Sequence, residues 1–254
     1  MSVTFEVRGR CAILTINRPE ARNAVNAAVA AGIEDGIDRI EADDELWVGI
    51  LTGAPPAFCA GADLKEVQGG TTGGLFTERG GFGGFAARQR TKPFIAAVDG
   101  PALAGGTELV LAADLVVATG RSIFGIPEVK RSLVAGAGGL FRLPRKIPEN
   151  VAMECALTGD PISAARAAHF GLVNELVEDD GAVAAALALA ERIIANGPLA
   201  VRESRGVVLA STHLNDDEAF ALSRQAMGKV AGSADLREGV AAFIEKRPPQ
   251  WTGR

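Results

Sequence analysis

Two glutamates of the sequence stand beside apolar segments of the kind found in a protein interior. Glu108 precedes the apolar run LVLAA, and Glu128 directly follows Pro127, which suits the first position of a helix. A buried carboxyl group near a second carboxyl group can act as a general acid or base near neutral pH, because both effects shift its pKa. A glutamate in the first turn of a helix is also an ordinary capping residue, so neither glutamate alone decides between the two interpretations.

Two short stretches offer backbone N–H groups that can bind an anion or a polarised oxygen. In PPAFCAGADLKE, residues 55–66, the small residues from Cys59 to Ala62 let a ligand approach the main chain. Gly105 and Gly106 stand where DGPALAGG leads into the apolar helix, and the first N–H groups of a helix are unpaired and lie at the positive end of its dipole. Two carboxylates and two donor sites together make a complete acid/base site with an oxyanion hole.

The composition argues against several other classes of site. The 254 residues carry a formal charge of -5, with 31 acidic and 26 basic residues spread along the chain, so no basic surface for nucleic acid is indicated. Cys11, Cys59 and Cys155 are far apart, and two histidines leave little material for a metal centre or a nucleophilic triad. No targeting segment or membrane span is indicated. We therefore expect a cytoplasmic protein with no metal, no nucleic-acid partner and no membrane partner.

Alternating or β-branched apolar runs predict strands, and helical patterns lie between them. The predicted strands are residues 4–7, 12–16, 48–52, 94–98 and 115–118, and the predicted helices among them are residues 26–42 and 106–113. This alternation predicts an α/β fold with a largely parallel, covered sheet. From about residue 148 helices dominate, at 150–157, 163–170, 182–195, 199–209, 217–227 and 236–245, with one short candidate strand at 172–177.

The segment from residue 68 to residue 85 holds eight glycines in eighteen residues. Glycine loses much backbone entropy when it is ordered, so this density predicts a loop rather than a regular element. The loop is either a mobile surface connection or a lid that orders over a bound substrate.

Seven motifs, in order and with similar spacing, make the chain resemble the enoyl-CoA hydratase (crotonase) family across nearly its whole length. They are NRPEARNAVN, LTG with FCAGADLKE, AAVDGPALAGGTELVLAADLVVA, FGIPEVK, AGAGG with RLPRKI, LTGDPISAARAAHFGLVNELV and EGVAAFIEKR. The resemblance implies a crotonase-like (ClpP-like) spiral core of repeated β-β-α units in residues 1–195, which binds acyl-CoA and carries catalysis. It implies a helical trimerisation region in residues 196–254, and so a homotrimer or a dimer of trimers.

The resemblance also implies roles for the suspected site residues. The N–H groups of Ala62 and Gly105 match the oxyanion hole that receives the thioester carbonyl of an acyl-CoA. Glu108 and Glu128 match the two glutamates that flank the reacting double bond in family members that hydrate enoyl thioesters. The implied enzyme is an enoyl-CoA hydratase of fatty acid metabolism, a hydro-lyase that adds water reversibly to a 2-enoyl-CoA to give a 3-hydroxyacyl-CoA. It implies no tightly bound cofactor, because the substrate itself is the coenzyme A thioester, and it leaves open which glutamate is the acid.

The same similarity implies where coenzyme A binds. The adenine is expected near Ala60, Ala62 and Leu64, with Lys65 as a phosphate partner. In relatives an AFxEK stretch from a neighbouring subunit reaches the cofactor, and this stretch matches Phe243 and Lys246 here. The oligomer would then complete the site.

Departures from the family pattern leave the acyl group of the substrate open. Ala104 stands where many relatives have glycine, although the donor position Gly105 is retained. Arg131-Ser132 and Ala135 replace the common leucine-glycine and the later proline, next to the expected acyl pocket. Within the family the alternatives are a carnitinyl-CoA dehydratase, which the C-terminal end also resembles, and an enoyl-CoA isomerase. A non-catalytic acyl-CoA-binding subunit is the alternative from another class.

Overall fold

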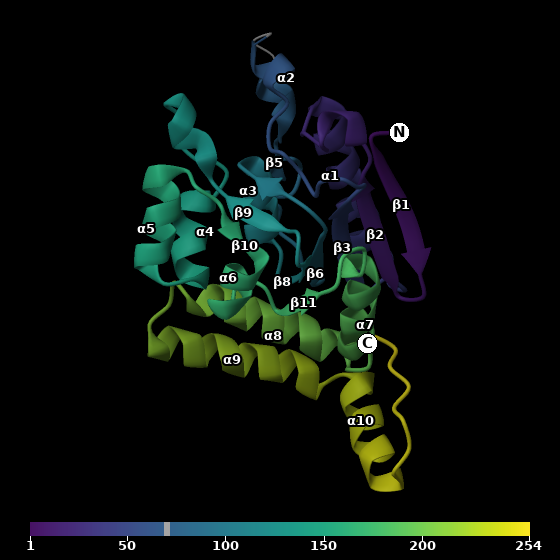
Figure 1. Cartoon of the computed structure of the whole chain (residues 1–254). Helices are drawn as coiled ribbons and strands as arrows, with labels where there is room; N and C mark the ends of the chain where they lie inside the picture. Colours follow the sequence, from purple (N-terminus) through teal and green to yellow (C-terminus); the bar gives the residue numbers. More distant parts are fainter. Residues whose placement is uncertain (69–71) are drawn as a thin grey trace.

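A six-stranded sheet forms the centre of the fold, in a computed structural model that describes residues 1–68 and 72–254 (Figure 1). The strand order is β1-β2-β3-β6-β8-β11, and only the β1–β2 pair is antiparallel within this sheet as described. The strands are β1 (Val3–Arg8), β2 (Cys11–Ile16), β3 (Val48–Gly53), β6 (Phe94–Val98), β8 (Leu115–Thr119) and β11 (Glu175–Val177). The prediction of an α/β fold around a largely parallel sheet is confirmed.

Helices cover the sheet and continue beyond it (Figure 1). They are α1 (Ala27–Ala42), α2 (Leu64–Gln68), α3 (Gly105–Ala112), α4 (Gly139–Lys146), α5 (Glu149–Thr158), α6 (Ala164–His169), α7 (Ala182–Ile194), α8 (Pro198–Ser211), α9 (Asp216–Ala231) and α10 (Ala234–Glu245). Short 3-10 helices are η1 (Pro19–Ala21), η2 (Thr72–Leu75) and η3 (Pro127–Arg131). All six helices predicted after residue 148 are confirmed as α5 to α10, and α10 extends away from the body of the chain.

Side chains of the central strands alternate between two apolar clusters, one on each face of the sheet. Ile13 of β2 and Ile95 of β6 pack against α7 on one face. Leu14 of β2 and Ala96 of β6 belong to the larger cluster on the other face, which includes α1 and α3. Because successive side chains of a strand point to opposite faces and both faces are buried, these strands consist of nearly continuous apolar residues. That property made them predictable.

A second, smaller sheet positions the functional residues. Its order is β10-β9-β7, with β7 (Ala102–Leu103), β9 (Ile123–Gly125) and β10 (Ile162–Ser163), and an isolated parallel bridge joins Cys59 to Ala102 beside it. The chain repeatedly passes from a strand of the large sheet to the small one and then into a helical segment, as in β6-β7-α3 and β8-β9-η3. The sequence did not predict these strands, since two or three residues are too few for a period-2 pattern.

Other sequence predictions need correction. The predicted strand at residues 172–177 is shorter, because only Glu175–Val177 pair with β8. Helix α4 was not predicted, and it contains Pro144, a residue that ordinarily argues against a helix interior.

The glycine-rich segment is more ordered than a loop along its described part. Residues 69–71 lie outside the described residues, but η2 and a short antiparallel pair, β4 (Phe76–Thr77) with β5 (Gly81–Phe82), follow them. Phe82 and Phe85 are buried in the larger apolar cluster. The segment therefore places Leu75, Phe82 and Phe85 in the core while Phe76 stays 51% exposed, so the loop prediction was wrong for the short elements, and a surface connection or a lid stays a prediction.

All three cysteines are buried and free. Within the described ranges, no group of three His, Cys, Asp or Glu side chains could hold a metal ion. No single described helix is long and apolar enough to cross a membrane, and the pair α7 and α8 meets the length and composition test only with a bend of 105° between them.

Candidate active site

Three consecutive turns of the chain bring the predicted functional groups to one edge of the small sheet. Ala62 follows the bridge residue Cys59, Gly105 follows β7, and Glu128 follows β9. Because β7 pairs in parallel with β9, and Cys59 pairs in parallel with Ala102, the segments that leave these three short strands emerge on the same side. Residues that are far apart in the sequence therefore meet.

The turn before Ala62 packs against the start of the helix that carries the second predicted donor. Helix α3 begins at Gly105, and a Cβ atom added to Gly61 would lie 3.2 Å from the nitrogen of Gly105. Among the hydrogen bonds of the described residues, neither the N–H of Ala62 nor that of Gly105 has an acceptor. Two neighbouring free N–H groups, one of them at a helix start, form a site for an oxygen that carries negative charge.

Both glycines of this helix start are required by close packing. A Cβ atom on Gly105 would lie 2.3 Å from the ring of Phe82, and one on Gly106 would lie 2.0 Å from the carbonyl oxygen of Cys59. A side chain at Gly105 would displace the ring of Phe82, and one at Gly106 would push the helix away from the Cys59 turn. The described part of the glycine-rich segment thus supports the donor site through Phe82.

Glu108 lies in the first turn of α3 and is almost fully buried, with 3% of its surface exposed. Its Oε1 accepts hydrogen bonds from the N–H groups of Ala137, at 2.7 Å, and Gly139, at 2.9 Å. Burial raises the pKa of Glu108, while these two N–H donors and the positive charge of Arg142 oppose the rise without cancelling it. Glu108 does not cap its own helix. It binds the start of a different helix, α4.

Glu128 lies in η3, where Pro127 occupies the first turn as the sequence predicted. Its Oε2 is buried and has no hydrogen-bond partner in the described part of the chain. Burial raises the pKa of Glu128, and the charge of Glu108 adds to the rise, while a backbone hydrogen bond from its own N–H and the charge of Arg131 oppose it without cancelling it. The two carboxyl groups are therefore electrostatically coupled, as a pair that shares proton transfer requires.

Comparison with known proteins agrees with this geometry. The sequence profile of the enoyl-CoA hydratase/isomerase family matches residues 6–254. The chain belongs to this family. Its relatives include enoyl-CoA hydratase EchA19 of Mycobacterium tuberculosis, 41% identical over 98% of this chain and 96% of the relative, and a carnitinyl-CoA dehydratase of Proteus mirabilis, 35% identical over 100% and 99%. A crystal structure of enoyl-CoA hydratase EchA1 from Mycobacterium marinum has 53% identity and a TM-score of 0.96, covering 100% of this chain and 99% of that one.

These findings confirm three predictions from the sequence. They establish the resemblance to the enoyl-CoA hydratase/isomerase family, the crotonase-like α/β fold and the class of enzyme, a hydro-lyase of the enoyl-CoA hydratase type. The roles of individual residues, the oligomeric state and the location in the cell stay predictions.

The residues predicted to bind coenzyme A fall into two groups in this family member. Ala60 and Ala62 lie on the turn that leads into α2, and Leu64, which is 61% exposed, and the exposed Lys65 are the first two residues of α2. Phe243, which is 86% exposed, and Lys246 lie at the end of α10, far from α3 within one chain (Figure 1). The structure of a single chain does not bring the second group to the site.

The partners of Glu108 were missed by the reasoning from the sequence. The AGAGG motif looked like an ordinary turn, yet its Ala137 and Gly139 donate to Glu108, and Arg142 of the following RLPRKI motif faces the same carboxylate. The available signal was the glycine pair before an apolar residue, which is typical of a helix start with free N–H groups.

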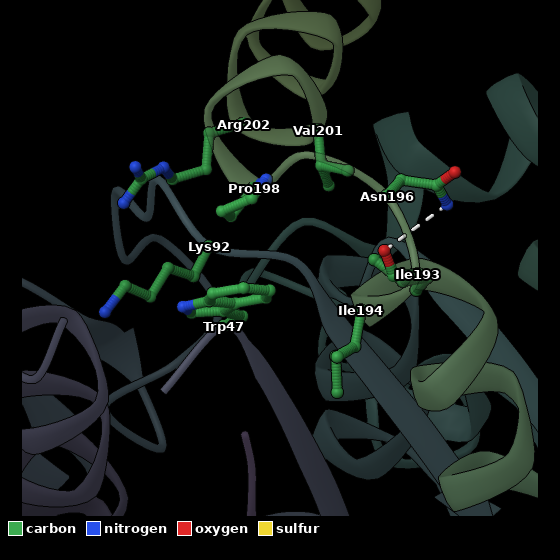
Figure 2. Close-up of a pocket in the computed structure, with 8 residues that line it drawn as sticks. All are labelled: Trp47, Lys92, Ile193, Ile194, Asn196, Pro198, Val201 and Arg202. Atoms are coloured by element: carbon green, nitrogen blue, oxygen red, sulfur yellow. Dashed lines mark hydrogen bonds between the residues drawn. The ribbon is translucent and has the colours of Figure 1, made fainter. Parts of the chain in front are cut away.

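The pockets found beside α7 and α8 are separate from this site. Figure 2 shows one of them, with Trp47, Lys92 and Arg202 among its lining residues and a free volume of about 10 Å³, enough for one water molecule. Lys92 is not free to bind a ligand there, because its Nζ donates to the carbonyl oxygens of Ile40 and Asp43, both at 2.6 Å. Two more open hollows, of about 500 and 440 Å³, lie beside it, and neither glutamate lines any of the three.

Proposed function

We propose that this chain hydrates 2-enoyl-CoA thioesters, with Glu108 and Glu128 as the acid/base pair and the N–H groups of Ala62 and Gly105 as the oxyanion hole. The observation that carries the proposal is the meeting of two coupled carboxyl groups of raised pKa with two adjoining N–H groups that have no acceptor among the described residues. Water addition to a conjugated thioester needs both parts, because a proton must be removed and another delivered while charge grows on the thioester oxygen.

The surroundings of the two carboxyl groups support different protonation states. Glu108 accepts two N–H hydrogen bonds and faces the cation of Arg142, and both interactions favour the carboxylate. Glu128 has one backbone hydrogen bond, from its own N–H, and Arg131 nearby, but its buried Oε2 has no described donor and the charge of Glu108 favours the neutral acid. We therefore assign Glu108 as the base and Glu128 as the acid in the direction of hydration.

In the proposed reaction the oxygen of a water molecule bonds to C3 of the enoyl group while Glu108 takes a proton from that water. The C2–C3 π electrons move toward the thioester carbonyl, whose oxygen is held by the N–H groups of Ala62 and Gly105. Glu128 then gives its proton to C2, which completes the 3-hydroxyacyl-CoA. Each N–H donor of such a site contributes about 3 kcal/mol to transition-state stabilisation. The reaction leaves Glu108 protonated and Glu128 ionised, and transfer of one proton between them restores the starting state.

The proposal includes how coenzyme A is held. The N–H of Ala62 serves the thioester, and Ala60 on the same turn, with Leu64 and Lys65 at the start of α2, would bind the adenine end and a phosphate of the coenzyme. No tightly bound cofactor takes part. The cytoplasmic location and the role in fatty acid metabolism remain predictions from the sequence.

The C-terminal region, residues 196–254, would complete the site by oligomerisation. Large apolar side chains on its helices are exposed in the single chain, including Val208 at 67%, Phe220 at 64% and Met227 at 68%. A homotrimer or a dimer of trimers would cover them and carry Phe243 and Lys246 of one subunit to the coenzyme of the next. We expect Phe243→Ala to raise KM for the CoA ester about ten-fold with kcat nearly unchanged, and light scattering would report the assembly.

The test of the function is a spectrophotometric assay of the purified protein with a short, a medium and a bulky 2-enoyl-CoA, following loss of the conjugated thioester absorbance. Rapid loss with any of them supports the hydratase, and the ranking reports on the pocket near Ser132 and Ala135. A 35% identical relative is named carnitinyl-CoA dehydratase, so carnitinyl-CoA is assayed in parallel. Binding of all CoA esters without turnover of any would contradict the proposal and favour a non-catalytic subunit.

A further inference from the structure

The guanidinium of Arg142 lies over the turn that holds Glu108. Its Nη1 donates to the carbonyl oxygen of Ala137 at 3.2 Å, and its Nη2 donates to the carbonyl oxygen of Ala86 at 2.7 Å. The N–H of the same Ala137 donates to Oε1 of Glu108. One residue of the turn is therefore bound to Glu108 through its N–H and to Arg142 through its carbonyl.

The turn leaves room for this guanidinium only because it contains glycine. Gly138 has φ +113°, and a Cβ atom there would lie 2.3 Å from Nη1 of Arg142. The neighbouring Gly139, whose N–H is the second donor to Glu108, would place a Cβ atom 3.2 Å from Cγ of Glu108. The turn thus packs between the carboxylate on one side and the guanidinium on the other.

Arg142 has no surface ion pair that would account for its position. In the described part of the chain no carboxylate oxygen lies within 4.0 Å of its nitrogen atoms, and its two side-chain hydrogen bonds go to neutral carbonyls. Burial lowers the pKa of Arg142, and the charge of Glu108 opposes that effect. A half-buried cation that faces a buried carboxylate across a turn stabilises the charged form of that carboxylate.

The other charges near this pair are few and can be named. The charge of Glu108 raises the pKa of Glu128 in η3, and Arg131 at the end of η3 lowers it. Arg145 of α4 lowers the pKa of Arg142. Among them, Arg142 is the charge that lowers the pKa of Glu108.

We propose that Arg142 is a positioning residue for the base, one that fixes the Ala137–Gly139 turn and keeps the Glu108 carboxylate ionised. The inference rests on the proposed function for its kinetic consequence. Arg142 also ties this turn to Ala86, at the end of the glycine-rich segment, so the base is held from two separate parts of the chain.

The first test is the pH dependence of kcat/KM for Arg142→Met, with Arg145→Met as the matched control. Arg145 lies on the same helix but is exposed and contacts His213 rather than the turn. Without the cation the pKa of Glu108 rises further, so the acid limb of the profile moves up by about one pH unit. Turnover then falls about ten-fold more at the acid limb than on the plateau, while KM stays within about two-fold. Arg145→Met keeps the wild-type limb.

Arg142→Lys separates charge from geometry. It retains the cation, so its acid limb stays near that of the wild type, but it cannot span both carbonyls, so its kcat falls. If Arg142→Met does not fold, Arg142→Gln removes the charge, retains a donor for Ala86 and carries the same expectation for the limb. An acid limb unmoved in a folded, uncharged variant would overturn the proposal.

An infrared titration measures the same shift in the pKa of Glu108 and does not depend on an activity assay. The difference spectrum between the wild type and Glu108→Gln isolates the carboxylate band of Glu108, and the titration is repeated in the Arg142→Met background. We expect the band to titrate about one pH unit higher there, and an unchanged titration would overturn the proposal. If the wild type hydrates no enoyl-CoA, the proposed function fails, yet this titration still decides the role of Arg142.

Discussion

The turn that holds Glu108 and the turn that holds Glu128 place two identical side chains in opposite surroundings. Around Glu108 the fold supplies two N–H donors and a facing cation, in a position with 3% exposure. Around Glu128 it supplies burial, the like charge of Glu108, one backbone hydrogen bond and the charge of Arg131, and it leaves Oε2 without a described donor. Both pKa values are raised, but through different balances of forces.

The comparison teaches how one fold keeps two carboxyl groups in different protonation states. Hydrogen-bond donors and cations favour a charged carboxylate, whereas burial and a neighbouring negative charge favour the neutral acid. Glu108 combines burial with two N–H donors and a cation, whereas Glu128 combines burial with a like charge that offsets part of what its one backbone hydrogen bond and Arg131 contribute. A proton acceptor and a proton donor can therefore coexist at one pH, which an acid/base pair requires.

Replacing each carboxyl group separately should have the largest effect and tests the comparison directly. Glu108→Gln and Glu128→Gln should each lower kcat by about 10²- to 10⁴-fold with CoA-ester binding largely intact, because each removes a proton-transfer step. The pH dependence of the remaining activity should differ between the two variants. Loss of the base removes the acid limb of kcat/KM, and loss of the acid removes the alkaline limb, as steady-state assays between pH 5 and pH 10 would report.

Two outcomes would break this assignment. If both variants lost the same limb, the two glutamates would not hold separate roles. If either variant turned over at the wild-type rate, that glutamate would be a structural residue. Binding of the product ester by calorimetry controls for damage to the coenzyme site.

A methyl group added beside Glu108 should disturb the turn that donates to it, and it would also lie 3.1 Å from the side chain of Ile126, which precedes η3. In Gly139→Ala the new Cβ would lie 3.1 Å from Cβ of Ala135 and 3.2 Å from Cγ of Glu108, so the N–H donor must shift. We expect kcat to fall about 10- to 100-fold, as for a misplaced catalytic group, and stability to fall by about 1–3 kcal/mol from overpacking. Gly136→Ala is the matched control, since its Cβ would meet no atom closer than 3.9 Å. Equal kinetics for the two variants would contradict the role of the Gly139 donor.

The sequence predicted the elements whose evidence is local and missed those whose evidence is tertiary. The large sheet was predictable because its buried strands are apolar runs of five or six residues, and Asn26 marks the start of α1 by accepting from the N–H of Val29. The short strands β7 and β9 can be recognised only from their pairing with each other in the folded chain. The donors to Glu108 lie 29 and 31 residues away from it along the chain, so no local pattern connects them. The pairing of Glu108 with Glu128 came from the family resemblance.

The stability of Glu128→Gln should depend on pH in a direction fixed by the raised pKa of Glu128. The folded state holds this proton above pH 4.5, the ordinary value, where the unfolded chain has already released it. Wild-type stability is therefore lost progressively as pH rises from that value through the folded pKa. Glutamine does not titrate, so the stability of the variant relative to the wild type should rise between pH 4.5 and pH 8. Urea unfolding at constant protein concentration measures both. A constant difference at the two pH values would contradict the raised pKa.

The smallest expected effect concerns two residues in left-handed backbone, one next to each half of the site. Ala104, before the donor Gly105, has φ 52° and ψ −128°, and Ser132, after the η3 turn of Glu128, has φ 57° and ψ 35°. The first conformation strains a residue with a Cβ by about 1–3 kcal/mol and the second by about 1–2 kcal/mol, while glycine loses about 0.5–1 kcal/mol more entropy on folding. Ala104→Gly should therefore stabilise the chain by about 1 kcal/mol and Ser132→Gly by about half as much. Because the N–H of Gly105 is oriented by α3 and by the packing of Phe82, kcat of Ala104→Gly should stay within about two-fold of the wild type. A large fall in kcat with a gain in stability would mean that strain at Ala104 itself orients the oxyanion hole.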